Sequence, residues 1–248
     1  MAVMLTSASH TAGRRAAVMW RIGWTVLTIC VVQSLVCGLS VLPVLLIWFP
    51  LVKSSRSMVW IRLLVFSFMV IPSYVLFALS LMALSALAVR ITGWRTPPNV
   101  DMRIAELDWP LLNWVRYMVS IHVVRVFAGT LFRGSPMWTA YLRLAGAHLG
   151  RRVYVNSLSV SDYNLLEFGD DVVIGADVHL SGHTVEDGMV KTARVRLSRN
   201  VTIGLGSVID IDVEAGPDCQ VGALSLVPKH TKLEAGAVYA GIPVRRIG

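Results

Sequence analysis

The chain has 248 residues, of which 55% are hydrophobic and only 15% are charged. Soluble proteins carry about 25% charged residues, so this composition excludes an ordinary soluble domain and indicates that part of the chain lies in lipid. All 15 Asp and Glu residues lie from residue 101 onward, whereas eight of the 23 Lys and Arg residues precede it, so the net charge of +8 belongs to the first hundred residues. Basic residues that flank apolar runs are typical of membrane-surface anchors, and we expect no nucleic-acid partner.

Two apolar runs predict a transmembrane helical hairpin within residues 22–95, after a basic N-terminal segment at 1–21. The runs cover residues 22–52 and 63–89, and each exceeds the roughly 20 residues that a bilayer core requires. No cleavage site closes the first run, so we interpret it as a retained anchor rather than a signal peptide. Tryptophans lie near the predicted membrane boundaries, as in aromatic belts: Trp20, Trp24, Trp48, Trp60 and Trp94.

The orientation of the hairpin follows from its basic flanks. The N-terminal and post-hairpin basic residues together outnumber those of the connection at 53–62, which predicts both termini, and with them the C-terminal domain, on the cytoplasmic side of the cell membrane. Pro43, Pro50 and Pro72 leave open a re-entrant hairpin that does not reach the far leaflet. In either case membrane lipid is an expected partner.

Residues 96–148 are predicted to form a linker and interfacial amphipathic helices. Between Asp108 and Phe132, polar residues such as Asn113, Arg116 and Ser120 recur every three to four positions among apolar neighbours. This pattern favours a helix that lies in the plane of the membrane interface. We interpret His122 as a residue of this helix rather than a metal ligand.

A six-residue repeat fills the C-terminal third, from about residue 149 to 248. Nearly every sixth residue is aliphatic in one register: Leu197, Ile203, Ile209, Ala215, Val221, Val227, Leu233 and Tyr239. Four positions later a second register holds smaller residues: Val201, Ser207, Val213, Cys219, Ser225, Thr231 and Ala237. Glycines directly follow several residues of the first register, and we expect them to adopt positive φ at turns.

Six residues make one short strand and one turn, and three such units close a triangular coil. The repeat resembles the left-handed parallel β-helix of the hexapeptide-repeat acyltransferases. The predicted fold is therefore a membrane α-helical hairpin followed by an all-β left-handed parallel β-helix. The resemblance also implies a homotrimer and, as donor, acetyl-CoA or another acyl thioester.

The repeat breaks between Leu180 and Val190, where a loop leaves the coil. The segment IGADVHLSGHTV resembles the galactoside and maltose acetyltransferase branch, in which the Gly-His at this position supplies the general base; the resemblance implies that role for His183. A neutral imidazole can take a proton from an acceptor hydroxyl or amine as it attacks a thioester carbonyl. A loop histidine bonded to backbone is the alternative interpretation.

The remaining histidines and the cysteines predict no metal site. His179 precedes His183 by four residues, a spacing that suits a metal pair on a helix but not on a strand and turn. We expect His148 and His230 to lie at the surface. The three cysteines are scattered and predict neither a disulfide framework nor a zinc site: Cys30, Cys37 and Cys219.

Four further polar residues are candidates for the site. The resemblance implies that Asn156 holds the acceptor or orients the thioester carbonyl. Asp162, Asn164 and Glu186 are competing candidates to orient the imidazole or hold the acceptor, although Asn and Asp also occur at turns for backbone reasons alone. Asp187 could act in the same way as Glu186, and a solvated loop explains both of these residues equally well.

The C-terminus resembles the closing segment of the same family, with Ala240–Pro243 matching its AGxP turn. The resemblance implies that Gly204, Ser207, Ala223 and Ser225 line the pantetheine groove. It further implies that three basic residues meet the CoA phosphates: Lys229, Arg245 and Arg246. Thr202 stands where the sugar-acetylating branch has a tryptophan, which argues against a simple sugar acceptor.

A second resemblance covers residues 138–248 and includes the join between the membrane part and the repeat. This stretch resembles the membrane-embedded C-terminal portion of poly-lysine-type non-ribosomal peptide synthetases. It implies an amide-forming partner of such a system, with an amine acceptor and an aminoacyl donor on a separate carrier protein. The leading hypothesis is a membrane-anchored acyltransferase; the amide-forming partner and a non-catalytic trimeric scaffold are its alternatives.

Overall fold

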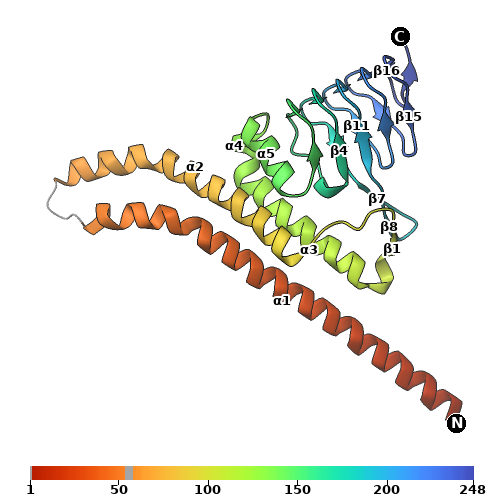
Figure 1. Cartoon of the computed structure of the whole chain (residues 1–248). Helices are drawn as coiled ribbons and strands as arrows, with labels where there is room; N and C mark the ends of the chain where they lie inside the picture. Colours follow the sequence, from red (N-terminus) through yellow and green to blue (C-terminus); the bar gives the residue numbers. More distant parts are fainter. Residues whose placement is uncertain (1, 54–57) are drawn as a thin grey trace.

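The computed structural model describes residues 2–53 and 58–248, and it joins a long helical hairpin to a β-helix through a layer of shorter helices (Figure 1). The hairpin consists of α1 (Ala2–Lys53) and α2 (Val59–Thr92). The predicted basic segment 1–21 is part of α1 where it is described, and Pro43, Pro50 and Pro72 lie inside the helices without ending them.

The two helices lie side by side and expose apolar side chains over most of their length (Figure 1). The Trp48 indole donates to Ser73 Oγ at 2.7 Å, which ties α1 to α2 near the far end of the hairpin. Phe49, Phe68 and Ile71 are each about 70% exposed. A contiguous apolar surface of this kind suits lipid rather than water. Three stretches are long and apolar enough to cross a membrane: residues 15–50, 59–92 and 109–132.

A layer of short helices lies between the hairpin and the β-helix: α3 (Trp109–Val124), a π-turn at Arg125–Gly129, α4 (Thr130–Phe132) and α5 (Pro136–Leu144). Tyr117 and Ile121 of α3, Trp138 and Tyr141 of α5, and Tyr163 of the first coils are fully buried together or nearly so. They belong to one apolar core that continues from α2 into the coil interior. The helical part and the β-helix are therefore packed as one unit.

The six-residue repeat forms a parallel β-helix with three strands in each coil. Ile203 pairs with Val221 in parallel, and Ile209 with Val227, so three hexapeptides complete one turn. The strands are β2 (His148–Leu149), β3 (Tyr154–Val155), β4 (Leu166–Phe168), β5 (Val173–Ile174), β6 (His179–Leu180), β9 (Val195–Leu197), β10 (Thr202–Ile203), β11 (Val208–Ile209), β12 (Glu214–Ala215), β13 (Gln220–Val221), β14 (Leu226–Val227), β15 (Lys232–Leu233) and β16 (Val238–Ala240). They form the sheets β3-β5-β10-β13-β16, β6-β11-β14 and β2-β4-β9-β12-β15, and β17 (Arg245–Arg246) closes the first of these antiparallel to β16.

The repeat glycines do not have the predicted positive φ. Gly204 packs so closely on the next coil that a Cβ would lie 2.4 Å from the Ala223 nitrogen, and a Cβ on Gly150 would meet Asp170 at the same distance. The positive φ falls two residues after a repeat glycine, for example at Asp171 and Asp177. These glycines are thus required by the stacking of coils, not by the turn.

The loop that interrupts the repeat is a β-hairpin of β7 (His183–Glu186) and β8 (Met189–Thr192). Its turn is Asp187–Gly188, both at positive φ, as two-residue hairpins require. The linker after α2 returns to this hairpin through β1 (Asp101–Arg103), which pairs with β8 in the order β1-β8-β7. The linker therefore crosses beside the residue predicted to be the base.

Candidate active site

His183 and Asp162 lie at the same corner of the β-helix on successive coils. Val160 bridges to Leu180 in parallel, and each chain then turns outward, which brings Asp162 beside the start of β7. Gly182 makes this approach possible, because a Cβ there would lie 2.9 Å from the Asp162 Cβ and equally close to Leu165. Asp162 itself has φ 50°, a conformation that Asp tolerates better than most residues.

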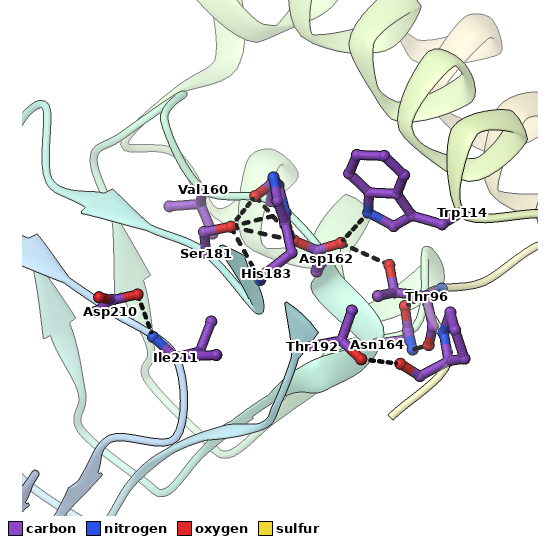
Figure 2. A network of polar contacts seen from close by, with 12 residues as sticks. Thr96, Trp114, Val160, Asp162, Asn164, Ser181, His183, Thr192, Asp210 and Ile211 are labelled. Carbon is purple, nitrogen blue, oxygen red and sulfur yellow. Dashed lines mark hydrogen bonds and ion pairs between the residues drawn. The ribbon is translucent and has the colours of Figure 1, made fainter. Parts of the chain in front are cut away.

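The carboxylate and the imidazole are in direct contact (Figure 2). His183 Nδ1 lies 2.5 Å from Asp162 Oδ2. Asp162 is fully buried, whereas the His183 side chain is 21% exposed. With Nδ1–H donated to the carboxylate, the lone pair is on Nε2, which makes no hydrogen bond among the described residues. The carboxylate thus holds the imidazole in one tautomer, in which Nε2 is able to accept a proton.

Four further donors surround the Asp162 carboxylate. Thr96 donates to Oδ1 at 2.6 Å and the Trp114 indole at 3.2 Å, while the hydroxyls of Ser161 and Ser181 each lie 3.2 Å from Oδ2. Burial favours the neutral acid, but the hydrogen bonds and charge of His183, with those of Thr96 and Ser161, outweigh it and lower the pKa of Asp162 below its ordinary value. The carboxylate is therefore ionised at neutral pH.

Figure 2 shows that these donors come from both parts of the protein, with Ser181 and His183 on one side of Asp162 and Trp114 and Thr96 on the other. Ser181 Oγ also lies 2.9 Å from His183 Nδ1 and accepts the backbone N–H of His183. The Trp114 ring meets the imidazole edge to face, with centroids 5.0 Å apart. The linker and α3 thus form one wall of the site.

Asn164 holds the linker rather than facing the imidazole. Its side-chain oxygen accepts the Thr96 N–H at 3.2 Å and its nitrogen donates to the Thr96 carbonyl at 2.8 Å. These two hydrogen bonds fix the backbone of the buried Thr96, whose hydroxyl reaches Asp162.

Asn156 and Glu186 lie apart from the His183–Asp162 pair. Asn156 follows β3 at another corner of the coil, beside Gly134. Glu186 is at the tip of the hairpin, where it bonds Lys191 at 2.7 Å and Lys229 at 2.6 Å. These two lysines lower the pKa of Glu186 to about 2. Lys229 is thus engaged by a carboxylate.

The expected groove residues also have internal roles. Ser207 and Ser225 are buried in the coil, where Ser207 Oγ donates to the Gly222 carbonyl at 2.9 Å and Ser225 Oγ accepts the Gly241 N–H at 3.2 Å. Gly204 packs on the exposed Ala223 of the next coil. Arg245 and Arg246 are exposed at the C-terminal end, and Arg246 pairs with Glu234.

Three other histidines are at the surface and form no hydrogen bond with His183 or Asp162. His179 and His148 are exposed on β6 and β2, and His230 pairs with Asp212 at 2.8 Å on the surface. Within residues 2–53 and 58–248, no group of three His, Cys, Asp or Glu side chains is placed to hold a metal ion.

Sequence reasoning missed Thr96, Trp114, Ser161 and Ser181. Trp114 lies in the stretch predicted to form an interfacial helix, and Thr96 lies in the predicted linker. Neither has a local signal, because each reaches Asp162 from a segment 48 or 66 residues away. The serines are adjacent to the repeat break, where small polar residues are ordinary turn formers.

Comparison with known proteins finds relatives that match between 40% and 59% of the chain. No protein-family profile matches the sequence. The delta-poly-L-ornithine synthetase of Acinetobacter baumannii is 26% identical over 137 residues, which cover 55% of this chain and 10% of that protein. The galactoside O-acetyltransferase of Escherichia coli is 34% identical over 108 residues, 40% of this chain and 52% of its own. Protein YrdA of Escherichia coli is 35% identical over 149 residues, 59% of this chain and 66% of its own.

The first two relatives extend well beyond what they share with this chain, which spans about a tenth of one and about half of the other. They correspond to the two resemblances drawn from the residues, to the galactoside acetyltransferase branch and to the poly-amino-acid synthetases.

Proposed function

We propose that this chain, which is similar to the hexapeptide-repeat acyltransferases in its C-terminal domain, is a membrane-anchored acyltransferase with a left-handed parallel β-helix. It would move an acyl group from a CoA or carrier thioester to an amine or hydroxyl acceptor. The contact of His183 with the buried, ionised Asp162 carries the proposal, because it gives a base with a defined tautomer at the edge of a coil.

The reaction follows from the orientation of the imidazole. His183 Nε2 takes the proton of the acceptor as its oxygen or nitrogen attacks the thioester carbonyl, and Asp162 stabilises the imidazolium that forms. The tetrahedral intermediate then breaks its carbon–sulfur bond. The imidazolium returns its proton to the leaving thiolate, so that base and thiol are both neutral at the end.

Membrane anchoring is supported by the apolar helices and by the way the site is built. Thr96 lies four residues after the end of α2, Trp114 belongs to α3, and both bond Asp162. The site is therefore adjacent to the segments proposed to lie in or on the membrane. An acceptor at the cytoplasmic membrane surface fits this position, and in a homotrimer of the family type three such sites would surround one axis.

The donor is tested by calorimetry on the full chain in detergent, with CoA and acetyl-CoA as ligands. We expect CoA and acetyl-CoA to bind saturably, and their affinity to fall when Arg245 and Arg246 are replaced by Ala. Arg151→Ala is the matched control, because Arg151 is also exposed but lies on the first coil. His183→Ala should leave CoA binding intact and abolish transfer of labelled acetyl groups from acetyl-CoA to membrane extracts. Unchanged transfer by His183→Ala would refute the proposed base and favour a scaffold.

The second candidate function is amide formation with a carrier-bound aminoacyl donor. It is favoured by the similarity to the ornithine polymer synthetase, which covers 55% of this chain. The same base would then deprotonate an amine. In this case CoA would not bind the folded protein, whereas an aminoacyl carrier protein would lose its aminoacyl group in a His183-dependent reaction.

A further inference from the structure

A cavity of about 410 Å³ lies where α2 and the linker meet the first coils of the β-helix. We call it the arginine cavity. Its polar and aromatic lining consists of Arg90, Trp94, Arg95, His148, Asn164 and Arg194. Its volume falls within the usual range for a site that holds a small molecule or headgroup.

The lining is cationic, and its three arginines come from three places in the chain. Arg90 lies in the last turn of α2, Arg95 in the linker and Arg194 between β8 and β9. No Asp or Glu belongs to the cavity lining within the described chain. Arg90 uses Nε to donate to the Leu144 carbonyl at 2.8 Å, which leaves its two terminal nitrogens for a ligand. Arginine presents paired N–H donors that match the oxygens of a phosphate.

Arg194 is partly neutralised by a carboxylate outside the cavity. It lies 2.5 Å from Glu167, but Glu167 also bonds Arg196 at 3.0 Å. Arg196 has a second carboxylate partner, Glu214, at 2.8 Å, so Glu167 offsets much of the charge of Arg194. The excess of positive charge in the arginine cavity therefore comes from Arg90 and Arg95, neither of which pairs with a carboxylate among the described residues. The chemistry that this excess recognises is an anion with several acceptor oxygens.

The arginine cavity lies at the C-terminal end of α2, where the apolar surface of this helix gives way to polar residues. Ile91, one helical position after Arg90, is 76% exposed, and Trp94 lines the cavity. The guanidinium of the buried Arg116 lies over the rings of both Trp94 and Trp109, at 5.8 and 5.4 Å from their centroids. Tryptophan and arginine gathered at the end of an apolar helix mark the headgroup region of a bilayer.

We propose that the arginine cavity binds the phosphate group of an anionic phospholipid. The inference rests on the proposed membrane insertion, but not on acyl transfer. A phospholipid delivers a phosphate to this level from the membrane itself, whereas a free phosphate would enter from the aqueous side. The occupant would touch Asn164, the side chain whose two hydrogen bonds hold Thr96 beside Asp162.

The test uses the full chain in a neutral detergent, with dioctanoyl phosphatidylglycerol, dioctanoyl phosphatidylcholine and inorganic phosphate as probes. Native mass spectrometry measures the bound fraction of each. We expect phosphatidylglycerol to bind at least about tenfold more tightly than phosphatidylcholine, and Arg95→Gln with Arg194→Gln to remove most of that preference, since each lost charged hydrogen bond costs about one order of magnitude in affinity.

Arg62→Gln is the matched control, because Arg62 belongs to the first turns of the same helix, at the opposite end from the cavity. An equal loss of lipid in Arg62→Gln would mean general charge attraction and overturn the proposal, as would equal binding of the two lipids. If inorganic phosphate displaced phosphatidylglycerol at equal concentration, the bound phosphate group would not have to come from a lipid, and the proposal would be overturned. Arg95→Gln alone tests the site without touching the Glu167 ion pairs, and an unfolding temperature measured without lipid confirms that each variant is folded. A failure of acyl transfer with lipid binding intact leaves this inference standing.

Discussion

Replacing Asp162 by Asn tests the proposed chemistry most directly, because the substitution keeps the shape of the side chain and removes its charge. Thr96 and Trp114 both donate to Oδ1. The amide oxygen of Asn therefore stays on their side, and its nitrogen faces His183. An amide nitrogen donates to Nδ1, so the imidazole proton moves to Nε2 and the lone pair that accepts the acceptor's proton is lost.

The expected loss follows from the role of the base. General-base catalysis contributes about 10²–10⁴-fold to the rate, so kcat for acyl transfer should fall by that factor, which corresponds to about 3–5 kcal/mol in the barrier. Because Asp162 acts through His183, His183→Ala should cost a similar factor, and the double variant should be no slower than the worse single one. The assay is release of CoA from acetyl-CoA, followed with a thiol reagent in the presence of membrane extract.

The chain offers a matched control. Asp212 and His230 form a second His–Asp contact, at 2.8 Å, and Asp212 also has positive φ, but both side chains are exposed. Asp212→Asn should leave kcat within about twofold, as expected for an exposed pair. If Asp162→Asn were as active as the parent, or if its effect simply multiplied that of His183→Ala, the two residues would not act as a unit and the reasoning would be refuted.

Three further outcomes are expected. Gly204→Ala should lower the unfolding free energy by about 1–3 kcal/mol, because the new Cβ would lie 2.4 Å from the next coil. Gly23→Ala should not lower it in this way, because a Cβ at Gly23 would meet no atom within 4 Å. Chemical denaturation of the two variants tests the difference. The pKa of Asp162 in the folded protein lies below its ordinary value of 3.8. The ionised carboxylate therefore contributes stability that is fully present above pH 3.8 and is lost as the pH falls through the folded-state pKa. The unfolding temperature of Asp162→Asn should accordingly depend less on pH below about 4 than that of the parent. Glu186→Gln should change kcat by less than about twofold, since Glu186 bonds Lys229 and Lys191 rather than His183, and a larger loss would place Glu186 in the site.

The repeat could be recognised from the sequence because its period is local and its side chains are sorted by size. Ile203, Ile209 and Val221 are buried as their register predicts, since six residues always return a side chain to the inside of the coil. The turns were predicted less well. Gly204 was expected to supply positive φ, but close stacking on Ala223 explains it, and stacking depends on a residue almost twenty positions away.

The residues of the candidate site also fall into two groups, those that the sequence indicated and those that only the structure reveals. His183 was identified because it opens an interruption of the repeat, and Asp162 was one of several polar turn residues until its contact with His183 singled it out. Thr96 and Trp114 had no such signal, because they reach Asp162 through packing of the linker and α3 against the β-helix. Position in a repeat can be counted along a chain, whereas a contact between distant segments depends on how the whole molecule packs.

The path of the linker sets an order of assembly during synthesis. Thr96 leaves the ribosome 66 residues before Asp162, and Pro97 leaves it 95 residues before Thr192, whose hydroxyl bonds the Pro97 carbonyl. Contacts of such long sequence separation form late in folding. The apolar helices α1 and α2 are therefore made while the linker still lacks its partners. The hydrogen bond between Thr192 and Pro97 forms only after β8 has been made, so the linker wall of the site is complete only once the chain extends through β8.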